Sequence, residues 1–124
     1  MTIKSYKELH MWQKGIDVTT RIYVLTSSFP KNESYGITDQ MRRAACSICA
    51  NIAEGWTRGK RDSVMHYLDM ANGSIAELET FLVISHKLNY LSTAQKTEID
   101  NELLIIGKMI NKMKAHLKTK PKNS

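Results

Sequence analysis

The sequence predicts an all-α protein folded as an up-down-up-down antiparallel four-helix bundle. Apolar residues recur at spacings of three and four along nearly the whole chain, and no segment shows the alternation of a half-buried strand. Short stretches with proline, glycine or helix-capping residues divide this pattern into four segments, which pack most simply as such a bundle. The 124 residues, 42% of them apolar, suit one domain. We assign it to residues 1–118, with a basic disordered tail at 119–124.

The first helix is predicted from about Tyr6 to Ser27. Ser5 and Glu8 have the spacing of a capping box at its start, and Pro30 disfavours helical backbone at the residue before it. Two adjacent apolar stripes run along this segment: Met11, Gly15, Val18, Ile22 and Leu25 form one, and Leu9, Trp12, Ile16, Thr19 and Tyr23 form the other. The second stripe exceeds what one bundle core needs, which indicates a surface for a partner chain.

The second helix is predicted from Thr38 or Asp39, which are suitable capping residues, to about Gly55 or Trp56. Its apolar seam has the spacing of a coiled coil and comprises Met41, Ala45, Ile48, Ile52 and Gly55. Most of its other positions are small, namely Ala44, Cys46, Ser47, Cys49, Ala50 and Ala53. Because small side chains let neighbouring helices approach closely, we expect this helix to be buried on more than one side.

Two further start signals open the third and fourth helices. Asp62 is a candidate cap for the third, which extends to about Asn89, and Ser92 with Gln95 forms a capping box for the fourth. The third seam comprises Val64, Leu68, Ala71, Ile75, Leu78 and Leu82, and the fourth comprises Ile99, Leu103, Ile106, Ile110, Met113 and Leu117. Both seams keep the same spacing, so each helix is expected to bury one face.

The net charge of +6 is located at the C-terminal end of the sequence. Residues 108–124 contain six lysines and no acidic residue, so residues 1–107 are neutral overall. A basic end segment is typical of an arm that contacts a polyanion; the alternative is a solubilising tail whose lysines complement the dipole of a helix C-terminus. A second basic cluster lies between the second and third helices. The candidate nucleic-acid-binding residues of both clusters are Arg58, Lys60, Arg61, Lys112, Lys114, Lys118, Lys120 and Lys122.

A set of polar residues recurs at helical spacing within the small-residue segments. The set comprises Arg43, Ser47, Asn51 and Glu54 on the second helix and Ser74 and Glu77 on the third. If the two faces meet, these groups form a structural network that fixes helix register. We then expect Arg43→Ala to cost about 2–5 kcal/mol, because it leaves a buried carboxylate or amide unpaired. A ligand pocket and a partner-contacting surface are the alternatives.

No pattern in the chain predicts catalysis, so we expect a non-enzymatic protein without cofactor or metal. Cys46 and Cys49 have the C-x-x-C spacing, but in the middle of a helix they are expected to be two small buried residues. The four histidines lack partners at the spacing of a zinc site, and no glycine-rich phosphate loop is present. Without a secretory signal or an apolar run of about 20 residues, the protein is expected in the cytoplasm, away from membranes.

A distinctive run of residues extends from the first loop into the third helix. It comprises Phe29-Pro30, Glu33, Tyr35-Gly36, Gln40, Arg42-Arg43-Ala44, Ser47-Ile48, Asn51-Ile52-Ala53-Glu54-Gly55, Gly73-Ser74 and Glu77-Leu78-Glu79-Thr80. With Trp12 and Tyr90-Leu91, this run resembles the four-helix-bundle proteins encoded in intervening sequences of bacterial 23S ribosomal RNA genes, over residues 6–118. That family in turn resembles the accessory variability proteins of diversity-generating retroelements, which form pentameric barrels and bind a reverse transcriptase and nucleic acid.

The resemblance implies a bacterial protein that assembles with itself, as a pentameric ring. Combined with the basic clusters, it predicts binding to RNA or DNA through phosphate contacts, without strong sequence specificity, because no aromatic residues are interleaved with the basic ones. The alternative function is a protein-interaction scaffold whose partner is a reverse transcriptase or a ribosome-associated protein.

Overall fold

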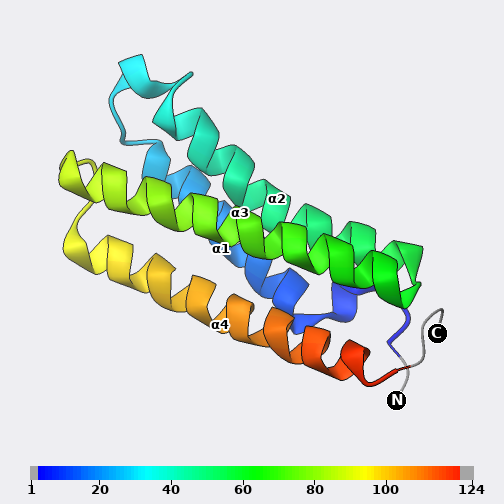
Figure 1. Ribbon diagram of the computed structural model, residues 1–124. Helices are drawn as coiled ribbons and strands as arrows, with labels where there is room; N and C mark the ends of the chain where they lie inside the picture. Colours follow the sequence, from blue (N-terminus) through cyan, green and yellow to red (C-terminus); the bar gives the residue numbers. More distant parts are fainter. Residues whose placement is uncertain (1–2, 121–124) are drawn as a thin grey trace.

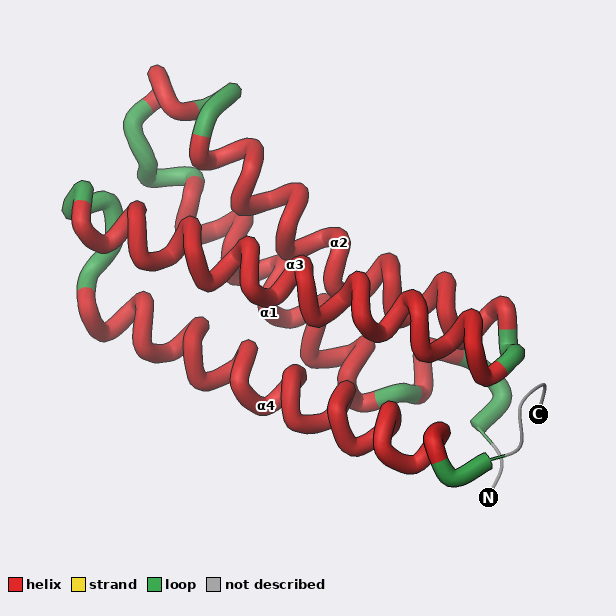
Figure 2. The backbone as a smooth tube through the Cα atoms, viewed as in Figure 1, coloured by secondary structure: helices red, strands yellow, loops and turns green. Residues whose placement is uncertain are grey.

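The computed structural model describes residues 3–120, and four long helices account for most of them (Figure 1). The helices are α1 (His10–Thr26), α2 (Ile37–Arg58), α3 (Arg61–Lys87) and α4 (Thr93–Lys118). Short 3₁₀ turns at Tyr6–Glu8 and Lys31–Glu33 precede α1 and α2 (Figure 2). Residues 3–120 contain no strand, so the prediction of an all-α fold with four helices is confirmed.

One apolar core lies between the four helices. Each helix packs against the next one along the chain, and α4 also packs against α1. The seams predicted for α2 and α3 are buried along their whole length, as are Ile99, Leu103, Ile106 and Ile110 of α4. Removing these side chains from water is the main stabilising contribution to the fold. Between residues 3 and 120, no helix combines the length and the apolar character needed to cross a membrane.

The first helix starts later than predicted. The capping box of Ser5 and Glu8 is present, but it closes the 3₁₀ turn at Tyr6–Glu8. Leu9 then adopts an extended backbone, with φ −72° and ψ 126°, and its buried side chain joins the core. Because an extended residue cannot continue a helix, the predicted single helix from Tyr6 is wrong, and α1 begins at His10.

The predicted caps of the second and third helices are also wrong. Helix α2 begins at Ile37, so Thr38 and Asp39 lie inside its first turn, and the capping position has no side-chain hydrogen bond. Helix α3 begins at Arg61, which places Asp62 inside its first turn as well. Both aspartates still mark a helix start correctly, since the dipole of a helix favours acidic side chains in its first turn.

The connections between helices depend on two residues with left-handed backbone. Gly59 ends α2 with φ +77° and donates its N–H to the Gly55 carbonyl at 3.2 Å. Asn89, with φ +62°, lies between α3 and α4. The capping box of Ser92 and Gln95 at the start of α4 is confirmed, with both reciprocal hydrogen bonds present.

Helix α2 makes close approaches to both of its neighbours. A Cβ atom added to Gly15 of α1 would lie 3.0 Å from the Cβ of Cys49, and one added to Gly55 would lie 2.9 Å from the Cβ of Tyr67. Both distances are tighter than ordinary side-chain contacts. The expectation that α2 is buried on more than one side is therefore confirmed, although Cys46 and Ala50 remain exposed.

Candidate nucleic-acid interface

The two basic clusters of the sequence meet at one end of the molecule. Figure 1 shows three segments at this end: the connection between α2 and α3, the end of α4 and the described residues that precede α1. Arg61 Nη1 donates a hydrogen bond to the backbone carbonyl of Lys120 at 3.3 Å, which joins the α2–α3 connection directly to the end of α4. We call this region the basic end; its described members are Arg58, Lys60, Arg61, Lys112, Lys114, Lys118 and Lys120.

Three of these basic side chains have acidic partners. Arg61 donates through Nε and Nη2 to Asp62 Oδ1, at 3.1 and 2.8 Å. Lys114 forms an ion pair with Asp69 of α3. Arg58 Nε lies 3.3 Å from Glu54 Oε2, and its guanidinium carbon lies 5.2 Å from the centre of the Tyr67 ring. These three residues therefore contribute less net positive charge than the sequence alone suggests.

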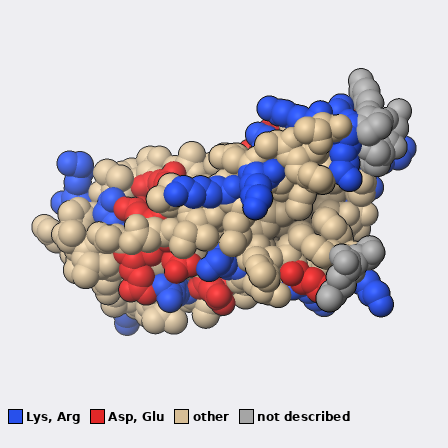
Figure 3. Space-filling model, turned by 90° about the horizontal axis from the view of Figure 1, so that it is seen from below, with Lys and Arg blue, Asp and Glu red and all other residues tan. Residues whose placement is uncertain are grey.

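The remaining lysines carry the uncompensated charge of the basic end. Within residues 3–120, Lys60, Lys112, Lys118 and Lys120 form no ion pair, and all four are exposed. Lys122 lies outside the described residues. On the face shown in Figure 3, many lysine and arginine side chains gather towards the right-hand end, and most acidic side chains lie in the left-hand half, with further basic side chains among them. The charge distribution is therefore polarised along the molecule.

Only part of the predicted polar network exists. Ser74 Oγ donates to Ser47 Oγ at 2.8 Å, which links α3 to α2, and Asn51 Nδ2 donates to the same Oγ at 2.9 Å. Arg43 does not join them: its side chain is 76% exposed and pairs with Asp39 at 2.9 Å. The expectation that Arg43 joins this network and pairs with a buried group is wrong.

The geometry of the helix explains this difference. Residues four apart are separated by about 400° of rotation, so such a set moves around the helix by about 40° at each step. Position 43 lies on the outer side of α2, while Ser47 and Asn51 approach α3. Glu54 and Glu77 are exposed and do not join the network, and Glu54 contacts Arg58 instead.

The two cysteines differ in their surroundings. Cys49 is buried, as expected, but Cys46 is exposed, so the expectation of two buried residues is half wrong. Burial raises the pKa of the Cys49 thiol, and a contact with the Thr19 hydroxyl, at 4.0 Å, opposes this shift. Among residues 3–120, no three histidine, cysteine or acidic side chains gather in a group suited to a metal ion.

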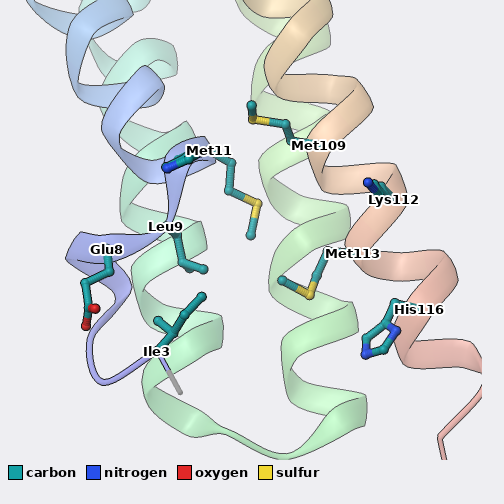
Figure 4. Close-up of a pocket in the computed structure, with 9 residues that line it drawn as sticks. Ile3, Glu8, Leu9, Met11, Met109, Lys112, Met113 and His116 are labelled. Atoms are coloured by element: carbon teal, nitrogen blue, oxygen red, sulfur yellow. The ribbon is translucent and has the colours of Figure 1, made fainter. Parts of the chain in front are cut away.

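Sequence reasoning missed an apolar groove beside the basic end. The groove encloses about 450 Å³ between the N-terminal segment and the last turns of α4. Its apolar lining consists of Ile3, Leu9, Met11, Met109 and Met113. Met11 and Met113 point into the space between α1 and α4, and Lys112 and His116 lie beside it (Figure 4). The spacing of Met109 and Met113, four residues apart on one helix, was the available signal, but only the fold places Met11 opposite them.

Comparisons with known proteins find a family and a solved structure that are similar to this chain. The family model for 23S rRNA-intervening sequence protein matches residues 7–112. A solved structure from Bacteroides thetaiotaomicron, described as a protein with unknown function from the S23 ribosomal protein family, is similar with a TM-score of 0.75 and 22% identity. That match covers 84% of this chain and 97% of the other, and it supports the fold. No curated protein matches the chain significantly. Since the family match reaches into all four helices, the chain belongs to the family of 23S rRNA-intervening sequence proteins.

Proposed function

We propose that this protein is a non-enzymatic, nucleic-acid-binding homo-oligomer that contacts phosphates through its basic end. The observation that carries the proposal is the hydrogen bond from Arg61 to the carbonyl of Lys120, which joins two basic clusters far apart in the sequence. Around it, four exposed lysines form no ion pair within the described residues. Lysines of this kind displace counterions from a phosphate backbone and bind with little regard to base sequence.

Paired lysine substitutions test this proposal. Lys118→Gln with Lys120→Gln removes two charges from the basic end, and Lys31→Gln with Lys87→Gln removes two exposed charges from the opposite end. In anisotropy titrations with labelled RNA at about 50 mM salt, we expect the first pair to weaken binding about fivefold to tenfold and the control pair to change it less than about twofold. Equal effects of the two pairs, or no binding by the unmodified protein, would contradict the proposal.

We further propose an up-down-up-down antiparallel topology for the bundle. Two contacts between helix ends support it. The Arg61–Lys120 hydrogen bond brings the start of α3 to the end of α4. At the other end of α3, the Tyr90 hydroxyl donates to Glu33 Oε2 at 2.8 Å, which brings the α3–α4 connection to the loop between α1 and α2. These contacts are those expected when consecutive helices reverse direction.

The proposed oligomer is a ring of five chains. Ile16 and Tyr23, from the second apolar stripe of α1, are 39% and 45% exposed, and the Tyr23 hydroxyl lies 3.9 Å from the exposed Cys46 Sγ of α2. Covering this face with another copy would remove apolar surface from water, and the number five rests on the resemblance to pentameric accessory proteins. A ring would repeat the basic end, so that weak phosphate contacts add together.

Sedimentation equilibrium tests the assembly. We expect a species close to five chains at micromolar concentration, and Ile16→Glu should shift the population towards smaller species, because a charged side chain cannot be buried in the interface without a partner. A clean monomer at that concentration would contradict the ring and remove the multivalent contribution to binding.

The same apolar face supports a second candidate function, a protein-interaction scaffold. In that case Ile16 and Tyr23 would contact another protein, such as a reverse transcriptase or a ribosome-associated protein, and the lysines would mainly keep the chain in solution. The nucleic-acid titration separates the two functions, because an intact oligomer that binds no RNA or DNA at about 50 mM salt favours the scaffold.

A further inference from the structure

The apolar groove beside the basic end is a surface feature that phosphate contact leaves unexplained. It is lined by two side chains of the core, Leu9 and Met11, and by Met109 and Met113, which are only partly buried. Ile3, which is 40% exposed, closes one side. A volume of about 450 Å³ falls in the range of pockets that accept small organic groups, and methionine side chains adapt their shape to such groups.

The groove is continuous with the basic end, because Lys112 belongs to both. Its side chain lies at the edge of the groove, next to His116 on the following turn of α4 (Figure 4). The one acidic side chain in the lining, Glu8, points away from the methionines, and its Oε2 accepts hydrogen bonds from the backbone N–H groups of Lys4 and Ser5. The edge on α4 therefore presents a lysine and a histidine, and no acidic side chain of the lining, to an occupant of the groove.

We propose that this groove takes an unpaired nucleobase of the strand whose phosphates contact the basic end, an inference that rests on the proposed function. The flat faces of the bases are the large apolar surfaces of a nucleic acid. In a duplex those faces are stacked and hidden, whereas in a single strand they are free to enter an apolar site. A base in the groove would cover Met109 and Met113 while its own phosphate stays near Lys112.

Binding of a base in the groove and phosphate contact alone predict opposite preferences between duplex and single-stranded nucleic acid. Duplexes carry a higher charge density than single strands, so a purely electrostatic surface favours the duplex. A site that also accepts a base favours the single strand. The most direct comparison uses two single strands with the same number of phosphates, one of oligothymidine and one whose residues all lack bases.

The experiment measures binding of both strands, each about 20 nucleotides long, by anisotropy at about 50 mM salt. The variants are Ile3→Gln and Met113→Gln, which make the groove polar without changing charge. Leu104→Gln is the control, since Leu104 is a 56% exposed apolar residue of α4 outside the groove. Ile3 precedes the helices, so its substitution tests the groove even if Met113→Gln weakens the fold.

We expect oligothymidine to bind about tenfold more tightly than the abasic strand, and both groove variants to reduce that ratio to less than about twofold. The abasic affinity should stay unchanged in all three variants, and Leu104→Gln should keep the full ratio. Equal binding of the two strands by the unmodified protein would overturn the groove while leaving phosphate binding intact. If neither strand binds, the proposed function itself fails.

Discussion

Residues that share one sequence pattern on α2 have different surroundings in the fold. Ser47 and Asn51 contribute to a hydrogen-bonded link with Ser74 of α3, while Arg43, one step earlier in the same series, is exposed and pairs with Asp39. An exposed pair four residues apart on a helix stabilises it by only a few tenths of a kcal/mol. The side chain that looked most important in the sequence therefore contributes little to the fold.

We accordingly expect Arg43→Ala to change the free energy of unfolding by less than about 0.5 kcal/mol. Ile48→Ala, which removes a fully buried side chain on the same helix, should cost about 2–5 kcal/mol and serves as the positive control. Chemical denaturation of both variants measures the two values. A loss above about 2 kcal/mol for Arg43→Ala would restore the buried network that the sequence predicted.

The two cysteines should react at different rates with a thiol reagent. Cys46 is exposed, whereas Cys49 is buried and its pKa is raised by that burial. Since the thiolate is the reactive form, a raised pKa lowers its population at a given pH and adds to the effect of poor access. Mass spectrometry after brief alkylation at about pH 8 should find Cys46 modified first. Faster modification of Cys49 would show that α1 and α2 separate readily.

At the scale of the helices, close contact is concentrated at α2. A Cβ atom added to Gly55 would lie close to the Cβ of Tyr67 and the Cα of Val64. A Cβ atom added to Gly73, in the middle of α3, would have no neighbour within 4 Å in the described structure. The first glycine is needed for packing, and the second lowers helix stability without a contact that requires it.

The two glycines should therefore respond in opposite ways to the same substitution. We expect Gly55→Ala to destabilise the protein by about 1–3 kcal/mol, because atoms near it must move. Gly73→Ala should stabilise it by about 0.5–1 kcal/mol, because alanine has the higher helix propensity. Thermal melts of the two variants give the comparison. Destabilisation by Gly73→Ala would indicate that another chain packs closely on that part of α3.

The apolar seams of the helices were predictable from the sequence, but several of their starts were not. The spacing of Val64, Leu68 and Ala71 requires one buried face whatever the neighbours are. By contrast, the break at Leu9 arises because this residue turns into the core, which depends on tertiary packing. Aspartates in first turns resemble caps in a sequence, since both positions favour acidic side chains.

At the scale of the whole molecule, the fold forms the basic end by bringing together two clusters that are far apart in the sequence. The sequence shows two basic clusters, and only the packing of α3 against α4 places Arg61 beside Lys120. The sequence also does not show which lysines lack an acidic partner, because the partner of Lys114 is Asp69, on a different helix. The groove lined by Met11 and Met113 joins residues from the two ends of the chain in the same way.

The salt dependence of RNA binding tests most directly whether the basic end contacts the phosphates of a nucleic acid. Removing residues 118–124 deletes Lys118, Lys120 and Lys122 and leaves every buried residue of α4 in place. Each phosphate contact adds about 0.7–0.9 to the slope of log affinity against log salt, so the truncated protein should bind more weakly, with a slope shallower by about 2 for each chain engaged. A truncated, folded protein with the slope and affinity of the full chain would show that the basic end does not hold the nucleic acid.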